Sequence, residues 1–232
     1  MNGVEPVDFL LQNRSYFEDI ITRSVYHSNA IEGNTLSYAE TYAIIWNDNS
    51  FQIRATPQEL YEVINLKYAL SYALDNIGQD LTEEMIVHIA VMINRNIAAI
   101  SGYRTGQVYI RGAEHIPPAP DMVRNEMVRF IDSCCRTEYR DIFDKLADTH
   151  LQFECIHPFE DANGRAGRVL LTYELLHNKY FPIVIPKEER ANYFAYLASQ
   201  NRIGLAEFFQ ALYEREIAVS YTHLTLPTKR IV

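Results

Sequence analysis

The chain has 232 residues, of which 48% are hydrophobic, and a formal net charge of −9 at pH 7. This length and composition can bury one sizeable core, so we expect one domain with an appendage. The negative charge argues against a nucleic-acid-binding surface, and no apolar run approaches the ~18 to 20 residues of a membrane span. We therefore expect neither nucleic acid nor a membrane as a partner.

The cysteines and the N-terminal segment bear on the compartment. There are three cysteines, two of them adjacent at Cys134 and Cys135, which gives neither a disulfide framework nor metal-ligand spacing. Met1 to Phe9 has no basic region followed by an apolar core, as a secretory signal would have. The cytoplasm is the simplest compartment.

Apolar residues at helical spacing predict four helices in the first hundred residues. The first is expected to run from about Phe9 to Ile31 and to end at Gly33, which suits a helix C-cap. The second begins with the capping box Ser37-Tyr38-Ala39-Glu40. The third starts at Thr56-Pro57 and closes at Gly78, and Thr82 caps the fourth. His88 in the fourth helix has no companion at metal spacing, so we interpret it as a packing or surface residue.

Residues 101–120 break the helical pattern. β-forming residues alternate there between glycines, with Val108, Tyr109 and Ile110 at the centre, and this pattern predicts a short β-hairpin. Taken alone, such a hairpin would be an ordinary surface feature.

Further helices are predicted on both sides of residues 157–168. Asp121 is expected to cap one helix, and another covers 139–155, where His150 and Glu154 lie one turn apart and favour a structural role over a ligand pair. Two more helices cover 187–200 and 205–218. Tyr193 and Tyr196 in the first of these fit either an adenine pocket or the core.

The segment His157-Pro158-Phe159-Glu160-Asp161-Ala162-Asn163-Gly164-Arg165-Ala166-Gly167-Arg168 is the richest in functional groups. Pro158 disfavours helical geometry at His157, so the preceding helix should end there and place the imidazole in a loop. The small residues before the next helix let backbone N–H groups and the positive helix end approach an anion. Arg165 and Arg168, three residues apart, can both reach that anion. Asp161 is a hard oxygen ligand suited to Mg²⁺ beside phosphates, and His157 is a natural general base.

This segment resembles the signature of the Fic family, His-x-Phe-x-(Asp/Glu)-Gly-Asn-Gly-Arg-x-x-Arg, and only Ala162 departs from it, where Gly is usual. The family typically transfers AMP from ATP to a Ser, Thr or Tyr hydroxyl of a target protein. The resemblance implies that His157 deprotonates the target hydroxyl and that Asp161 holds Mg²⁺. It also implies that Asn163 and Gly164 bind the phosphates and that Arg165 and Arg168 neutralise the leaving pyrophosphate. ATP, Mg²⁺ and a target protein are thus the expected partners, and association with a second copy of the chain stays open.

Two further segments resemble the family. Ser28, Glu32 and Gly33 fit the inhibitory-helix pattern (Ser/Thr)-x-x-x-Glu-(Gly/Asn), in which the Glu pairs with the second arginine, here Arg168. The predicted hairpin at Val108, Tyr109 and Ile110 corresponds to the flap that holds the target by strand-like backbone pairing.

The predicted fold is all-α, a Fic-type bundle of about eight helices with one β-hairpin flap. Residues 1–50 form the N-terminal region with the inhibitory helix at about 24–33, and 51–218 form the Fic core. Residues 219–232 do not continue the helical pattern and resemble the translation of a sequencing adaptor, so the natural C-terminus is expected to be missing.

Three alternative functions stay open beside AMP transfer. A relative that transfers phosphate would have Lys at position 164. Removal of AMP would use Glu32 to orient water. A nucleotide-binding regulator without activity would follow if Ala162 disrupts the loop. We expect Ala162 to have a negative φ angle and Ala162→Gly to change activity little.

Overall fold

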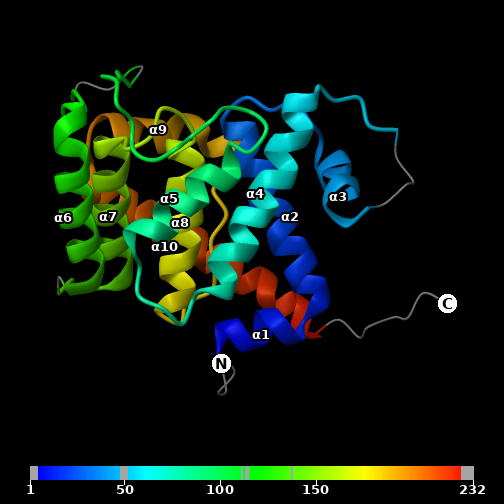
Figure 1. Cartoon of the computed structure of the whole chain (residues 1–232). Coiled ribbons are helices and arrows are strands. Elements are labelled where there is room, and N and C mark those ends of the chain that lie inside the picture. The colour runs from blue at the N-terminus through cyan, green and yellow to red at the C-terminus, as the bar shows by residue number, and fades with distance from the viewer. Residues whose placement is uncertain (1–4, 48–51, 111, 113–114, 137, 226–232) are drawn as a thin grey trace.

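The computed structural model describes residues 5–47, 52–110, 112, 115–136 and 138–225. Regular structure in these residues consists of ten α-helices and two short 3₁₀ helices, without strands (Figure 1). The elements are α1 (Pro6–Gln12), α2 (Arg14–Ile31), α3 (Tyr38–Trp46), α4 (Pro57–Asp75), α5 (Glu83–Ile93), η1 (Pro120–Met122), α6 (Val123–Arg136), α7 (Ile142–Ile156), α8 (Asn163–His177), η2 (Lys187–Glu189), α9 (Arg190–Ala198) and α10 (Arg202–Thr225).

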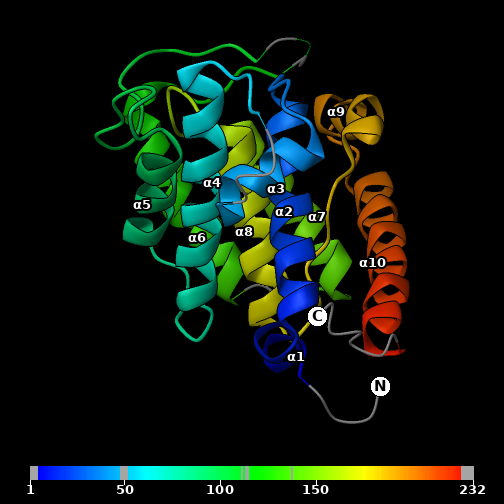
Figure 2. The same cartoon turned by 90° about the vertical axis from the view of Figure 1, so that its right-hand side faces the viewer.

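Helix α8 lies in the centre of the bundle. In both Figure 1 and Figure 2 it is surrounded by other helices, and it packs against α2, α4, α5 and α7. Nearly all its residues are buried, including the charged Arg165 and Arg168. A helix enclosed on all sides is held rigidly by close packing. Its N-terminus is therefore a fixed point on which a binding site can be built.

The C-terminal end of α2 is embedded in the core. Ile31 is fully buried in a cluster with Leu175 of α8 and Phe209 of α10. Near the N-terminus of α2, Tyr16 donates a hydrogen bond of 2.8 Å to Glu216 of α10, and Arg23, in the middle of α2, forms an ion pair of 2.8 Å with the same carboxylate. Helix α2 is thus fixed along its length, and Glu32 directly follows it.

The predicted helix starts are largely confirmed, whereas the number of helices is wrong. Ser37 forms the expected capping box with Glu40, and Thr82 accepts a hydrogen bond from the Met85 N–H. The first predicted helix is divided because the Asn13 side chain caps a new helix by accepting the Tyr16 N–H. Asp121 does not cap α6 but lies within η1.

No strand occurs in the described residues of the loop that was predicted to be a hairpin; Arg111, Ala113 and Glu114 lie outside them. The physical reason is the returning arm, where Pro117, Pro118 and Pro120 have no N–H to donate to a ladder. The two arms are joined instead by side chains: Gln107 donates to the Pro117 carbonyl at 3.1 Å, and Arg104 donates to the Pro118 carbonyl at 2.6 Å.

Helix α10 continues to Thr225, so the prediction that helical structure ends at Ala218 is wrong. Nothing between 218 and 225 interrupts the backbone hydrogen bonds, since this stretch contains neither Gly nor Pro. Ser220 is buried and donates to the Ile217 carbonyl. Among the described helices, none combines the length and the apolar composition needed to cross a membrane.

Candidate active site

His157 stands in a tight turn at the end of α7. The helix ends at Ile156, as Pro158 predicts, and His157 adopts the left-handed conformation with φ 49° and ψ 62°. Its Nδ1 lies 3.3 Å from the Glu154 carbonyl oxygen. A carbonyl only accepts, so Nδ1 carries the proton and the lone pair of the neutral ring is on Nε2. Burial lowers the pKa of His157, and Arg104 lowers it further against the opposing effects of the Glu154 carbonyl and Glu32. The ring is therefore neutral and able to accept a proton at neutral pH.

The loop after His157 is closed by Asn163. Its side-chain Oδ1 accepts the Phe159 N–H, and its Nδ2 donates to the Phe159 carbonyl, both at 2.9 Å. The Asn163 side chain thus holds the loop through both of its polar atoms. Phosphate binding by Asn163 stays a prediction, for which its backbone N–H, in the first turn of α8, is a suitable donor.

Ala162 contradicts the expected negative φ angle. It is the N-cap residue of α8 with φ 72° and ψ 7°, a left-handed conformation that strains a residue with a Cβ atom. The conformation persists because Phe159, Asn163 and the buried start of α8 fix the chain on both sides.

Ala162→Gly is therefore expected to raise the free energy of unfolding by about 1 kcal/mol. Urea denaturation of the two proteins is the measurement. Ala166→Gly, inside α8 with an ordinary helical conformation, is the matched control and should lower stability. A loss of stability in Ala162→Gly similar to that in the control would contradict strain at position 162.

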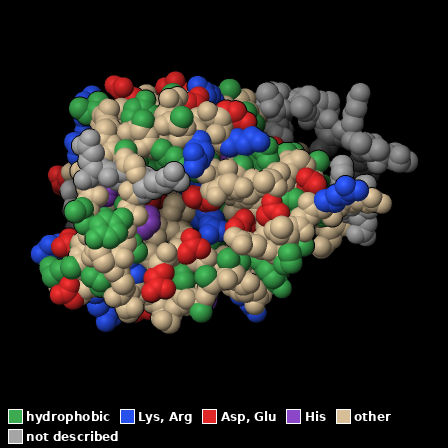
Figure 3. All heavy atoms as spheres, turned by 90° about the horizontal axis from the view of Figure 1, so that it is seen from above, with side chains coloured by type: hydrophobic (Ala, Val, Ile, Leu, Met, Phe, Trp, Pro, Cys, Tyr) green, Lys and Arg blue, Asp and Glu red, His purple; other side chains and the backbone are tan. Residues whose placement is uncertain are grey.

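A cavity of about 900 Å³ opens at the N-terminus of α8. Figure 3 shows this region from above, with basic, acidic and histidine side chains around a hollow. The walls come from the loop 157–162, which we call the catalytic loop, from the start of α8, from the end of α2, from α4, α7 and α9, and from the segment around Ile110. They include His157, Asp161, Gly164, Arg165, Glu32 and Phe194. The predicted loop residues are thus brought to one cavity large enough for a nucleotide.

Arg165 is a buried cation at this cavity, with 5% of its surface exposed. Its Nη2 lies 3.4 Å from Asp161 Oδ2, and its Nη1 lies 3.9 Å from Glu62. Within the described residues, Nε and Nη1 have no hydrogen-bond partner. Buried donors without acceptors are costly unless a ligand supplies oxygens. Arg165 is therefore suited to bind an anion.

Asp161 meets the requirements of one Mg²⁺ ligand. Its Oδ1 accepts the Ala162 N–H at 2.6 Å, and its side chain is half exposed at the cavity. The described residues contain no group of three His, Cys, Asp or Glu side chains able to hold a metal by themselves. Mg²⁺ keeps water and phosphate oxygens beside one or two carboxylates, so a single Asp161 fits an ion that arrives with a nucleotide.

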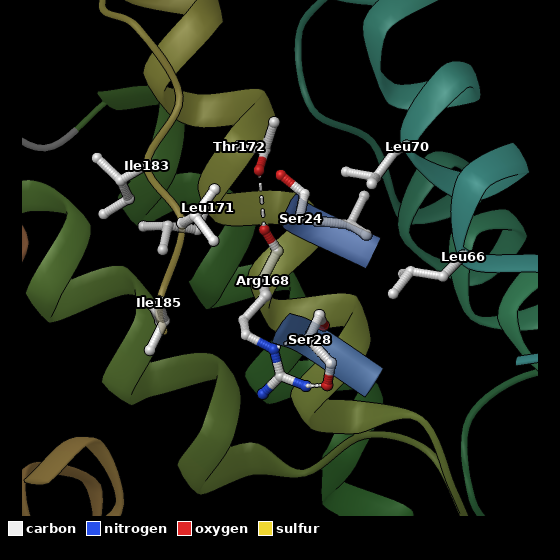
Figure 4. Close-up of a pocket in the computed structure, with 11 residues that line it drawn as sticks. Ser24, Ser28, Leu66, Leu70, Arg168, Leu171, Thr172, Ile183 and Ile185 are labelled. Atoms are coloured by element: carbon white, nitrogen blue, oxygen red, sulfur yellow. Dashed lines mark hydrogen bonds between the residues drawn. The ribbon is translucent and has the colours of Figure 1, made fainter. Parts of the chain in front are cut away.

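Arg168 is turned away from the cavity and toward α2. Figure 4 shows its side chain beside Ser28, and its Nε donates to Ser28 Oγ at 2.8 Å. Nη2 donates to the Ser28 carbonyl at 3.1 Å and to Glu32 Oε1 at 2.6 Å. The pairing of Glu32 with Arg168 expected from the sequence is therefore present. Burial raises the pKa of Glu32, but Arg168, Arg165 and Arg190 outweigh this effect and hold that pKa below its usual value.

Gly164 admits the Glu32 carboxylate to the start of α8. A Cβ atom at position 164 would lie 2.6 Å from Glu32 Oε1 and 3.2 Å from Arg168 Nη1, and Glu32 remains 36% exposed. The carboxylate thus lies beside the helix terminus and the arginine that would attract a phosphate.

Arg190 is a residue that the sequence analysis missed. Its Nε donates to the Ile31 carbonyl at 2.7 Å, and its guanidinium lies 4.5 Å from the centre of the Phe194 ring. It therefore connects the C-terminus of α2 to α9 at the cavity wall. No local signal indicates this contact, because the two residues are 159 positions apart.

Tyr193 belongs to the core. It is fully buried, and its hydroxyl lies 2.7 Å from His150 Nε2. The structural role expected for His150 agrees with this contact. Helix α9 presents Phe194 and Leu197 to the cavity instead, and these residues form an apolar wall that suits a nucleotide base.

One of the three predicted flap residues lines the cavity. Ile110 contributes to the wall, Val108 is half buried, and Tyr109 is 77% exposed. The segment is irregular, and it reaches the cavity through Ile110.

Comparisons with known proteins agree with this geometry. Residues 80–175 match the model of the Fic/DOC family. The chain is 30% identical over 204 residues to a protein adenylyltransferase Fic of Drosophila melanogaster, covering 85% of this chain and 40% of the relative. It is 29% identical over 204 residues to that of Nematostella vectensis, covering 84% and 46%. The chain thus spans less than half the length of these curated relatives.

A solved structure supports the fold. A Fic domain containing signaling protein from Bacteroides thetaiotaomicron has a TM-score of 0.80 at 20% identity, with 90% of this chain and 89% of that chain covered.

Proposed function

Because the chain contains a domain of the Fic/DOC family, we propose that it transfers AMP from ATP to a Ser, Thr or Tyr hydroxyl of a target protein, and also to itself. The observation that carries this proposal is the shared cavity. It combines the free Nε2 of a neutral imidazole with a buried guanidinium whose Nε and Nη1 have no hydrogen-bond partner in the described part of the chain.

The residues of the cavity have separate roles in this reaction. Nε2 of His157 accepts the proton of the target hydroxyl as its oxygen attacks the α-phosphorus of ATP. The bond from the α-phosphorus to the bridging oxygen then breaks, and pyrophosphate leaves. Arg165, the N-terminal N–H groups of α8 and, once released, Arg168 stabilise the charge on the leaving group.

Asp161 would hold Mg²⁺ at the mouth of the loop. When bound, the ion would neutralise charge on the phosphate oxygens. The apolar residues Phe194 and Leu197 would pack against the base. Val108, Tyr109 and Ile110 would hold an extended segment of the target, mainly through its backbone.

Glu32 inhibits the reaction in this proposal. Its carboxylate occupies Arg168, so the γ-phosphate loses that partner, and ATP binds in a pose misaligned for attack. Residues 24–33 are then an inhibitory segment formed by the last turns of α2 and its C-cap, with Ser28 as a further acceptor for Arg168.

ATP labelled at the α-phosphate or at the γ-phosphate tests the reaction. Incubation of the Glu32→Gly variant, in which transfer is not inhibited, with a target and each nucleotide should incorporate label from the α position only. Label from the γ position only would mean phosphate transfer, a reaction for which Gly164 would be unusual. Absence of label from either position, together with measurable ATP binding, would leave a nucleotide-binding regulator.

Removal of AMP is a second candidate, favoured by the position of Glu32. Glu32 and His157 line the same cavity, and Glu32 stays ionised because its pKa lies below the usual value. A carboxylate there could orient water toward the phosphorus of a modified target. Release of AMP from a pre-modified target by the protein, and its loss in Glu32→Gln, is the corresponding test.

A further inference from the structure

Arg104 is a buried cation outside the residues assigned to the reaction. Only 2% of its surface is exposed, and its donors meet backbone carbonyls. Nε donates to His157 at 2.8 Å, Nη1 to Gly106 at 2.9 Å, and Nη2 to Pro118 at 2.6 Å and Ile156 at 3.4 Å. Burial lowers the pKa of Arg104, and no carboxylate in the described part of the chain counteracts this effect.

These carbonyls belong to three different segments. Ile156 and His157 supply the last carbonyls of α7, which have no partner within the helix and attract a cation. Gly106 and Pro118 lie on the outgoing and returning arms of the target-docking loop. The backbone N–H of Arg104 adds a fifth hydrogen bond, 2.9 Å to the Pro158 carbonyl. One planar guanidinium thus fixes the distances among the catalytic turn and both arms of the loop.

The hydrogen bond from Arg104 to His157 lies at a strained position of the backbone. His157 has a φ angle of 49°, a conformation that costs free energy in a residue with a Cβ atom and persists only where neighbours impose it. The hydrogen bond from Arg104 fixes the carbonyl of this same residue. The direction of the imidazole therefore depends on Arg104, although the guanidinium itself binds the backbone.

We propose that Arg104 is a positioning residue that holds the His157 imidazole and the target-docking loop in a fixed relation to one another. The effect of Arg104 on the rate of AMP transfer rests on the proposed function. Its effect on the position and pKa of the His157 imidazole does not. Misplacing a reacting group by about 1 Å can cost on the order of 10²-fold in rate, so a loose connection here would matter even with every catalytic group present.

The charge of Arg104 gives the proposal an independent readout. His157 is faced by Arg104 and His115 from the loop, by Glu32 from the end of α2, and by the Glu154 carbonyl of α7. Burial lowers the pKa of His157 most, and the Arg104 cation lowers it as well. Arg104→Met removes the cation at similar size, so it should raise the pKa of His157. Arg104→Lys keeps the cation and should leave the pKa closer to that of the unmodified protein.

The experiment follows the imidazole resonances of the full chain by NMR from pH 5 to 9, without nucleotide. His157→Ala identifies the His157 signal, and the expected result is a shift of its titration to higher pH in Arg104→Met but a smaller shift in Arg104→Lys. Asn65→Leu is the matched control. Asn65 is another buried side chain that donates to two backbone carbonyls, those of Ile93 and Arg95, so its loss should reduce stability without moving the His157 titration.

Kinetics complete the test in the Glu32→Gly background. The Lys ammonium in Arg104→Lys cannot donate to the same carbonyls in the planar arrangement of a guanidinium. We therefore expect kcat/KM for the target to fall about 10- to 100-fold, while KM for ATP stays constant. A His157 titration unchanged in folded Arg104→Met overturns the proposal. If that variant does not fold, an unchanged kcat/KM in Arg104→Lys overturns it. If no variant transfers AMP, the proposed function fails, and the titration still decides the role of Arg104.

Discussion

Replacement of His157 by Ala is expected to reduce AMP transfer by about 10²- to 10⁴-fold, the usual cost of losing a positioned general base. The reason is specific to one atom: Nδ1 is turned to the Glu154 carbonyl, so Nε2 is the nitrogen left for the target hydroxyl. ATP binding should be retained, because Arg165 and the N-terminus of α8 are unchanged.

The measurement uses label from the α-phosphate of ATP in the Glu32→Gly background, where transfer is not inhibited. ATP affinity is determined separately by calorimetry. His88→Ala is the control, since His88 is an exposed residue of α5 that lies 4.6 Å from the Tyr72 ring and does not line the cavity. An undiminished rate in His157→Ala would falsify the assignment of the base.

Glu32→Gly is expected to increase AMP transfer, including self-modification, by about tenfold or more. A tenfold effect corresponds to ~1.4 kcal/mol in favour of the paired arrangement. The physical reason is that Arg168 loses its carboxylate and becomes available to the triphosphate, while His157, Asp161 and Arg165 are untouched. Adding Arg168→Ala should remove the gain, because the guanidinium for which Glu32 competes is also the one ATP needs.

Self-labelling is compared across the unmodified protein, the two single variants and the double variant. Glu32→Gln distinguishes charge from size, since it keeps the shape of the side chain and should still activate. Equal labelling of Glu32→Gly and the unmodified protein would mean that residues 28–34 are only the end of a helix. Slower labelling would mean that Glu32 itself takes part in the reaction and would favour AMP removal.

Local sequence rules predicted helix ends and helix caps, because these features depend on neighbouring residues. Pro158 ended α7 at Ile156, and Ser37 with Glu40 formed a capping box, since each of these effects acts within one helical turn. The pairing of Glu32 with Arg168 spans 136 residues and could be expected only from the resemblance to a family.

Other features depend on contacts that no local rule contains. Ala162 has a positive φ angle because Asn163 and Phe159 impose it, although alanine alone disfavours it. The hairpin fails because prolines in the returning arm remove the donors of a ladder, a factor that the alternating pattern of Val108 and Ile110 does not reveal. Arg104 gives no periodic or motif signal, since its partners are carbonyls of any residue type.

The buried end of α2 has a consequence for how the protein would respond to its surroundings. Ile31 is packed among residues of α8 and α10, and Arg190 holds its carbonyl, so the position of Glu32 is coupled to the whole C-terminal half. In the proposed scheme, each ~1.4 kcal/mol in favour of this arrangement lowers about tenfold the fraction of the protein in which Arg168 is available to ATP, and so the rate of transfer. The packing around Ile31 would then determine how strongly Glu32 inhibits transfer. A binding partner that loosens α9 or α10 would weaken this inhibition without contacting the catalytic loop.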